Sequence, residues 1–255
     1  MYIDVHCHLD SDYYDNIDEV IKSAKDNGVD KFIYNGCNIQ TNKQVLKLIN
    51  MYDSVYGAIG FHPTDLNGIT DDDYLFLEDN IKNNKIVAIG EIGLDYHYED
   101  TDKENQKKHF IRQLELARKY DMPVIIHSRD SIQDTYNILK EYPVKGVLHC
   151  YSGSVEMARE FVKLGMFISV GGIITFKNAK NIIEVIKDID LSYILLETDS
   201  PYLTPEPYRK YKNEPKYIPV IASKIAEIKG IDVCEVRDVT TSNAGGLFDF
   251  WLKSW

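Results

Sequence analysis

Two histidines separated by one residue, His6 and His8, stand near the start of the chain in the stretch Asp-Val-His-Cys-His. Side chains alternate between the two faces of a β-strand, so both imidazoles are expected on one face and Cys7 on the other. Neutral imidazole is the commonest protein ligand for a divalent transition metal, which makes the pair a candidate part of a metal site. Two histidines can also meet by chance at a strand end, so the pair alone does not decide between these interpretations.

Residue types that bind metals also occur at the ends of other apolar runs. The third run leads into His62, the fourth into Glu91, the fifth into His127, the sixth into His149 and the eighth into Asp199. An imidazole or carboxylate in such a position is costly to bury unless it is paired or bound to a metal. One such residue would be explained as a satisfied polar group of the core, but the whole series favours a metal site.

The candidate ligands are four imidazoles and two carboxylates: His6, His8, Glu91, His127, His149 and Asp199. This set exceeds the three protein ligands that are typical of one catalytic zinc ion. It suits two ions about 3.5–4 Å apart, with Glu91 as the bridging ligand because it is the lone acid of the fourth run. Nitrogen and oxygen donors together fit Zn, Mn, Co or Ni, and Mg at the more oxygen-rich position. We therefore predict two divalent cations per chain, of undetermined identity.

A regular series of strands and helices must position these residues. Eight short apolar runs rich in β-forming residues span 2–6, 31–35, 55–60, 86–91, 124–127, 146–149, 167–170 and 193–197. Stretches with helical spacing follow them at 17–24, 41–52, 71–81, 102–120, 131–142, 155–164, 179–189 and 219–229. Thr41 and Gln44 match a capping box at the start of the second helix.

Strand followed by helix, eight times, predicts an α/β fold in which a parallel sheet is closed by its helices. We expect a single (β/α)8 TIM barrel with the active site at the C-terminal ends of the strands. One domain would cover residues 1–255, with 231–255 packing as a final helical segment. The chain has no Gly-x-Gly-x-x-Gly motif after its first strand, so a dinucleotide-binding sheet loses its main support.

The composition predicts a packed globular protein, because 44% of the residues are hydrophobic and 27% are charged. No apolar run approaches the roughly 18 residues that suggest a membrane span, and the first residues lack a basic region and a signal-peptide core. We expect a cytoplasmic protein without membrane contact. Its four scattered cysteines are then expected to be free thiols, with Cys7 buried by packing.

The net charge of −11 argues against a globally basic surface for nucleic acid. It does not exclude a polyanionic substrate, because bound divalent cations can dominate the local field of a cleft and invert its sign.

Taken together, the motifs resemble those of the TatD family of metal-dependent deoxyribonucleases, within the amidohydrolase-like barrels. The most specific pieces follow one another along nearly the whole chain: DVHCHLD, GFHP, GEIGLDY, QLELARKYDMPVIIHSRD, LHCYSGS, GGIITFKNAK, LLETDSPYLTP and NEP. The resemblance implies a two-metal hydrolase that cleaves phosphodiester bonds of DNA, usually as a 3′–5′ exodeoxyribonuclease. It implies the six ligands named above and places His62 in the substrate pocket near the phosphate.

The sequence departs from the family in one loop that bears on the substrate. The family often has Arg-Gly-Lys-Arg before Asn-Glu-Pro, whereas this chain has Arg209-Lys210-Tyr211-Lys212. The loop stays basic but its shape must differ, so substrate preference is the least determined part of the resemblance.

Roles in hydrolysis can be assigned as a hypothesis. Asp199 would accept or steer the proton of the attacking water, with Glu91 as the second catalytic carboxylate, while His62 and Arg129 would bind non-bridging phosphate oxygens. Arg129 could instead form an ion pair with Asp130 or Glu197. Arg209 and Lys212 are candidates for flanking phosphates. Glu197 lies one residue layer deeper than Asp199 and is expected to support the ligands from behind.

Three functions remain open from the sequence. The first acts on DNA, as single strands or at 3′ ends, without an obligate protein partner. The second is an amidohydrolase-type enzyme that cleaves a small amide, ester or lactone with the same metals. The third is a non-catalytic protein with a relic site, which ranks last because no ligand is missing.

Overall fold

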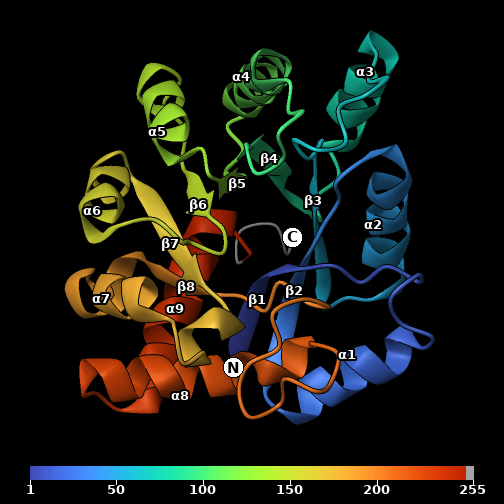
Figure 1. The fold of residues 1–255 in the computed structure, drawn as a ribbon. Helices are drawn as coiled ribbons and strands as arrows, with labels where there is room; N and C mark the ends of the chain where they lie inside the picture. The colour runs from blue at the N-terminus through green and yellow to red at the C-terminus, as the bar shows by residue number, and fades with distance from the viewer. Residues whose placement is uncertain (251–255) are drawn as a thin grey trace.

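The computed structural model describes residues 1–250 and contains the eight predicted strands. They are β1 (Tyr2–Cys7), β2 (Val29–Asn35), β3 (Val55–Ile59), β4 (Ile86–Asp95), β5 (Val124–Arg129), β6 (Gly146–Leu148), β7 (Met166–Val170) and β8 (Ile194–Leu196). All neighbours pair in parallel and in chain order. The sheet closes where Cys7 bridges Ser200 and where the Asp199 N–H donates to the carbonyl oxygen of His6 at 2.9 Å. The predicted (β/α)8 barrel is confirmed (Figure 1).

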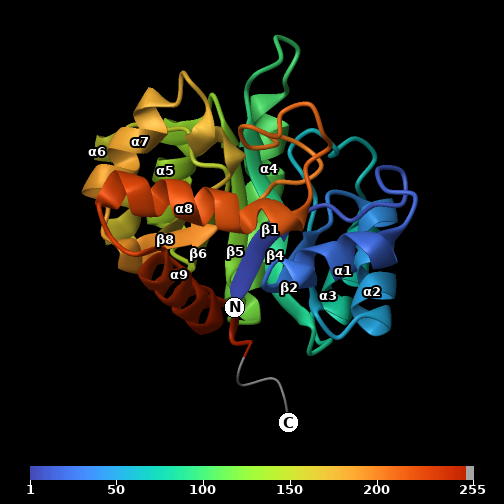
Figure 2. The ribbon, with the colours of Figure 1, turned by 90° about the horizontal axis from the view of Figure 1, so that it is seen from below.

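The helices in residues 1–250 surround the strands as an outer ring, except the last one, which lies across the end of the barrel where the N-terminus is (Figures 1 and 2). They are α1 (Ile17–Asp26), α2 (Ile39–Met51), α3 (Asp71–Asn80), α4 (Lys103–Lys119), α5 (Ile132–Glu141), α6 (Val155–Lys163), α7 (Lys180–Asp188), α8 (Ile218–Lys229) and α9 (Val233–Phe248). Three 3-10 turns interrupt the loops: η1 (Gly172–Thr175), η2 (Leu191–Tyr193) and η3 (Pro215–Tyr217).

The predicted cap of the second helix was wrong. Helix α2 begins at Ile39, and Asn38 is its N-cap, because the Asn38 side chain accepts from the Thr41 N–H at 3.0 Å and the Thr41 hydroxyl oxygen accepts from the Asn38 N–H at 3.0 Å. Thr41 therefore takes part in the capping box as its third helical residue rather than as the cap.

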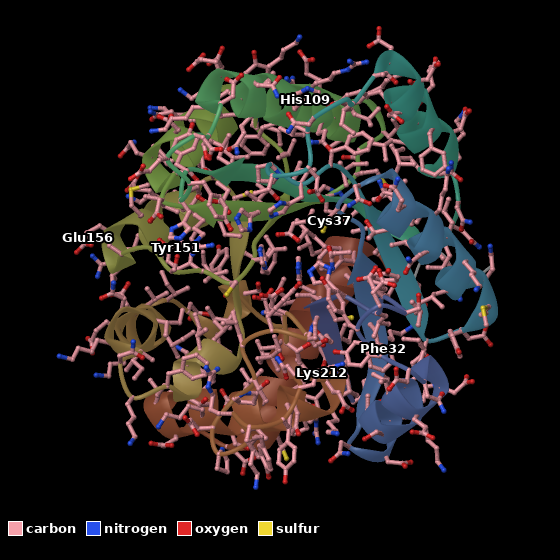
Figure 3. All side chains as sticks on the ribbon, turned by 45° about the vertical axis from the view of Figure 1, so that its right-hand side comes forward. Phe32, Cys37, His109, Tyr151, Glu156 and Lys212 are labelled. Carbon is pink, nitrogen blue, oxygen red and sulfur yellow. The ribbon has the colours of Figure 1, made fainter. Side chains whose placement is uncertain are left out.

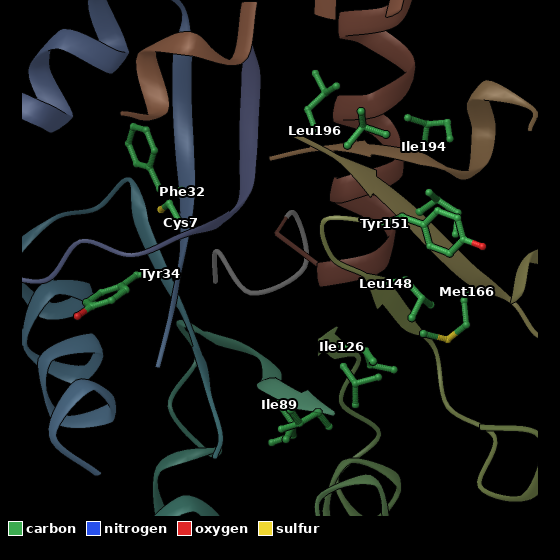
Figure 4. Close-up of a cluster of buried hydrophobic side chains, with 14 of the residues drawn as sticks. Cys7, Phe32, Tyr34, Ile89, Ile126, Leu148, Tyr151, Met166, Ile194 and Leu196 are labelled. Carbon is green, nitrogen blue, oxygen red and sulfur yellow. The ribbon is translucent and has the colours of Figure 1, made fainter. Parts of the chain in front are cut away.

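Two hydrophobic clusters hold the barrel together. The larger lies between the strands and the ring of helices, and it includes Cys7, Phe32 and Ile89 (Figure 4). Cys7 is fully buried there and its thiol donates to the carbonyl oxygen of Ile33 at 3.4 Å, so its predicted packing role is confirmed. All four cysteines are free, as expected.

The second cluster lies on the inner face of the strands. It joins Val5, Ile33, Val147 and Leu195 to Phe248 of α9. Helix α9 and the N-terminus lie at the same end of the barrel, and the loops that follow the strands lie at the other (Figure 2). The expected final helical segment corresponds to α9, and residues 251–255 lie outside the described residues. Within residues 1–250, no helix combines the length and apolar character needed to cross a membrane.

Candidate metal centre

His6 near the end of β1 and His8 just after the strand lie together at the open end of the barrel, and β1 contains one extra residue before its end. Asp4 pairs with Phe32 and Cys7 with Tyr34, so three steps along β1 match two along β2. An added residue of this kind shifts the alternation of side chains. Val5 therefore belongs to the inner cluster while Cys7 belongs to the outer one. The Nε2 atoms of His6 and His8 lie 3.3 Å apart.

Glu91 stands at the centre of the imidazoles and presents a different oxygen to each of two groups. Its Oε2 lies 3.4 Å from Nε2 of His6 and 3.7 Å from Nε2 of His8. Its Oε1 lies 3.0 Å from Nδ1 of His127 and 2.9 Å from Nε2 of His149. One oxygen of the carboxylate thus faces His6 and His8, at and just after the end of β1, and the other faces His127 of β5 and His149, which follows β6.

Asp199 adds a second carboxylate on the side of β1. Its Oδ1 lies 3.5 Å from Nε2 of His6 and 3.6 Å from Nε2 of His8. Its backbone has φ of 53°, in the left-handed region, at the point where the chain leaves β8 and closes against β1. The side chain comes to the centre through barrel closure, since residues 6 and 199 are far apart in the chain.

The spacing of these donor atoms fits divalent cations. Two donors bound at about 2.1 Å to one tetrahedral ion lie about 3.4 Å apart, and the nitrogen–oxygen distances here run from 2.9 to 3.7 Å. Residues 1–250 contain three triads in which the potential ligand atoms lie within 4.8 Å of one another. They are His6–His149–Asp199, His6–His8–Glu91 and His62–Glu91–His127. The structure therefore places His, Glu and Asp groups for metal binding.

The carboxylates of the centre are held in their ionised form. Burial raises the pKa of Glu91, but the neighbouring imidazoles, led by His149, outweigh it and keep the pKa well below its usual range. Burial likewise raises the pKa of Asp199, and His8 with the other histidines brings it below its ordinary value. Burial lowers the pKa of His149, yet Glu91 raises it to about 9. A cation at this place would meet negative carboxylates at neutral pH and would displace the proton of His149 on binding.

Asp95 is a residue of the centre that the sequence interpretation missed. Strand β4 continues four residues beyond Glu91, and Asp95 at its end is buried. Its Oδ2 lies 3.1 Å from Nε2 of His127, the ring nitrogen that faces away from Glu91, and its Oδ1 accepts from the His97 N–H at 3.0 Å. A carboxylate on the far nitrogen of a metal-binding histidine fixes the tautomer and orientation of the ring. Its position in the GEIGLDY motif was the available signal.

Glu197, the residue after β8, lies behind the centre on the side of His149. It is fully buried, its Oε1 accepts from the Cys150 N–H at 2.5 Å, and its Oε2 accepts from the Ser169 hydroxyl at 2.5 Å. Nδ1 of His149 lies 3.8 Å from Oε1. Burial raises the pKa of Glu197 to about 7.

A cavity of about 660 Å³ opens over these groups and contains some of the predicted substrate residues. His62 and Arg129 line it together with Glu91 and Asp199. Nε2 of His62 lies 3.4 Å from Oε1 of Glu91. Within residues 1–250 Arg129 makes no ion pair with Asp130 or Glu197, because Asp130 instead faces Nδ1 of His97 at 3.2 Å and Glu197 is bonded as described above.

Arg209 and Lys212 lie outside the lining of this cavity. The Arg209 guanidinium stacks over the ring of Phe176 at 4.1 Å, and the Lys212 ammonium donates to the carbonyl oxygen of Tyr13. Lys212 is seen on the segment that follows β8 (Figure 3). In this arrangement neither cation faces the candidate ligands.

Comparisons of the sequence and of the structure with known proteins agree on one family. The sequence pattern of the family described as TatD related DNase matches residues 3–249. The metal-dependent hydrolase YabD of Bacillus subtilis is 42% identical over 252 residues, which cover 97% of this chain and 99% of that protein. The crystal structure of YjjV, a TatD homologue of Escherichia coli, is 32% identical and superposes with a TM-score of 0.91 over 97% of this chain and 98% of YjjV. A TatD family hydrolase of Entamoeba histolytica is 29% identical, with a TM-score of 0.86 over 97% of each chain.

Proposed function

The chain belongs to the TatD-related DNase family of metal-dependent hydrolases, and from this premise we propose that it hydrolyses phosphodiester bonds of DNA with two divalent cations, as a 3′–5′ exodeoxyribonuclease. The orientation of Glu91 carries the proposal of two cations, because each of its oxygens faces a different set of imidazoles. A single catalytic ion typically takes three protein ligands, whereas six candidate ligands meet at this centre.

Each set would hold one cation. The first consists of His6, His8, Asp199 and Oε2 of Glu91. The second consists of His127, His149 and Oε1 of Glu91. When bound, the pair of cations would lower the pKa of a shared water and polarise phosphoryl oxygens. The identity of the ions is left open, among Zn, Mn, Co, Ni and Mg.

The protein's own side chains would transfer the proton, bind the phosphate and orient the histidines. Asp199 lies at the centre and is ionised at neutral pH because its pKa is below its ordinary value, so its carboxylate is free to accept the proton of the attacking water and pass it towards the leaving oxygen. His62, whose ring is also 4.5 Å from that of His127, and Arg129 line the cavity where the non-bridging phosphate oxygens would lie. Asp95 would hold His127 in orientation from behind through a hydrogen bond, while the Glu197 carboxylate, 3.8 Å from Nδ1 of His149, would act on that ring by its charge.

Burial of the centre supports a chain end as the substrate. His6 is fully buried and Glu91 is 3% exposed, so a phosphate must enter the cavity to reach them. The end of a single strand is narrow enough to enter the cavity, whereas a phosphate in the middle of a duplex lies on the surface of a much wider double helix. The direction from the 3′ end is the part that rests on family resemblance alone.

The test is hydrolysis by metal-depleted protein that is re-supplied with Mg, Mn, Co, Ni or Zn. The substrates are a single-stranded oligonucleotide labelled at one end or the other, and a panel of small amides, esters and lactones. We expect metal-dependent release of mononucleotides from the 3′ end. Cleavage of a small ester or lactone without cleavage of DNA would refute the proposal and favour the amidohydrolase alternative. Stepwise release from the 5′ end would refute the polarity only.

A further inference from the structure

The rim of the barrel mouth is strongly asymmetric in charge. The loops after β1 and β4, residues 8–16 and 96–102, carry six acidic residues and no lysine or arginine. Residues 171–180 after β7 and residues 202–217, further along the chain after β8, carry six basic residues and two acidic ones in a chain whose net charge is −11, while Glu197 and Asp199 before the second segment belong to the metal centre. We call these last two segments the basic rim. A polyanion that leaves the cavity is repelled by the first pair of loops and attracted by the basic rim.

The two segments of the basic rim form one surface. The Arg209 guanidinium lies 4.1 Å above the ring of Phe176, and the Glu206 N–H donates to the Thr175 hydroxyl oxygen at 2.8 Å. An added Cβ at Gly172 would come within 2.1 Å of the Leu203 carbonyl oxygen, so the backbones are in close contact. The two segments of the basic rim are therefore held against each other.

Exposed tyrosines lie along the same surface. Tyr202 is 49% exposed, Tyr208 37% and Tyr211 54%, and no other segment in residues 1–250 has three exposed large hydrophobic residues so close in sequence. Large aromatic rings are usually covered, because their exposure to water is unfavourable. Three exposed rings interleaved with cations are typical of surfaces on which unpaired bases stack.

The exposed tyrosines lead outwards from the metal centre. Tyr202 lines the cavity, its ring centroid lies 6.3 Å from that of His8, and its hydroxyl lies 2.6 Å from that of Tyr13. Tyr208 and Tyr211 line a separate depression of about 470 Å³. Lys212 borders this depression and donates to the carbonyl oxygen of Tyr13, so it connects the depression to the wall of the cavity.

Cations on the basic rim are available to a ligand. Within residues 1–250, Lys177, Lys180 and Lys210 are exposed and form no ion pair. The Lys210 ammonium lies 5.0 Å from the centroid of the Tyr211 ring, which places a positive charge beside an exposed aromatic face. The combination offers a ring for a base and a cation for the adjoining phosphate.

We propose that the basic rim binds the unpaired nucleotides of a DNA strand whose end lies in the cavity, with Tyr202 and Tyr211 stacking on bases and Lys177, Lys180 and Lys210 facing phosphates. This inference rests on the proposed DNase function and adds the path that the strand follows outside the cavity. A duplex hides the faces of its bases in its own stack, so it can use the cations of the rim but not its rings.

The experiment measures binding of fluorescein-labelled oligothymidylates of 2 and 12 residues by anisotropy. Phosphorothioate linkages slow cleavage, and the metal-loaded protein is used. The test variant is Lys210→Ala with Tyr211→Ala. The matched control is Lys187→Ala with Tyr193→Ala, which also removes one exposed lysine and one exposed tyrosine, from α7 and from η2 at the opposite end of β8. Hydrolysis of bis(4-nitrophenyl) phosphate, which is too short to reach the rim, reports the state of the metal centre.

We expect the test variant to bind the 12-mer at least about tenfold more weakly than the unaltered protein, since one base–aromatic stack and one phosphate contact are lost. Its affinity for the dinucleotide and its rate with bis(4-nitrophenyl) phosphate should stay unchanged. The control variant should bind both oligonucleotides normally. A 12-base-pair duplex should bind more weakly than the single strand.

Different results would overturn the inference or the function beneath it. If the unaltered protein cleaves DNA but the test variant binds the 12-mer normally, or the control variant loses as much affinity, the rim is not the path and the DNase proposal stands. Equal competition by oligoglutamate would show that the surface recognises charge alone and would also overturn the inference. If the unaltered protein neither binds nor cleaves DNA, both proposals fail.

Discussion

Replacing Glu91 with Gln should remove one metal ion of the proposed pair and leave the other. The substitution keeps the size of the side chain but removes its charge, and the amide offers only one oxygen. His6 and His8 still face Asp199 at 3.5 and 3.6 Å. Among the described residues, only Glu91 has a carboxylate oxygen within 4.0 Å of Nδ1 of His127 and Nε2 of His149.

The expected loss of metal affinity follows from this difference between the ligands on the His6 side and those on the His127 side. One elementary charge about 4 Å from another is worth about 4 kcal/mol at an effective dielectric constant of about 20. Loss of the only anionic ligand should therefore weaken the second ion by about 10³-fold. The first ion keeps a carboxylate and should weaken less. Hydrolysis should fall by at least the same factor as the second site empties.

The assay is the metal content per chain after equilibrium dialysis against limiting Mn²⁺, together with thermal unfolding to confirm the fold. Asp10→Asn is the matched control, because Asp10 is a buried acid that lines the same cavity but accepts from the Tyr34 hydroxyl at 2.5 Å instead of facing the imidazoles. We expect two ions in the unaltered protein and in this control, and one in Glu91→Gln. Two tightly bound ions and full activity in Glu91→Gln would remove Glu91 from the bridging position.

Three further predictions concern positioning, packing and capping. Asp95→Asn should lower metal affinity at the His127 side by about 10–100-fold, measured by calorimetric titration; unchanged affinity would show that His127 needs no support from Asp95. Phe161→Ala should lower the free energy of unfolding in urea by about 3–5 kcal/mol, because the ring is fully buried between strands and helices, and a loss under 1 kcal/mol would contradict this packing. The N–H and hydroxyl of Thr70 lower the pKa of Asp73, so its stabilising contribution is present above pH 4 and is lost as the pH falls below. Asp73→Ala should therefore reduce the melting temperature at pH 7 but leave it equal to that of the unaltered protein near pH 2, and a pH-independent difference would refute the role of this carboxylate.

Sequence pattern alone was sufficient for the strands and for the order of the barrel. Near-continuous apolar runs separated by helical periodicity leave few ways to bury both faces of eight strands, so the closed parallel sheet follows from local signals. The candidate ligands could likewise be identified from the sequence, because a carboxylate or imidazole at the end of a buried strand is unusual in any fold.

Tertiary structure decided which atoms face each other. Simple alternation would put Val5 on the same face as Cys7, but the extra residue in β1 moves Val5 inwards, and such a shift depends on pairing with β2. Asp95 was missed because the apolar run was ended at Glu91. The strand continues since Gly93 lets β4 pass close to β5, where an added Cβ would lie 1.9 Å from the His127 carbonyl oxygen.

The sequence also could not show where the basic side chains near the mouth of the barrel point. Charge and position in the chain made Arg209 and Lys212 candidates for phosphate binding, but Phe176 and Tyr13 hold them outside the lining of the cavity. Residue types are fixed by the sequence, and they determined the kind of chemistry this protein can perform. The direction of each side chain depends on contacts between segments far apart in the chain, and only barrel closure brought His6 next to Asp199.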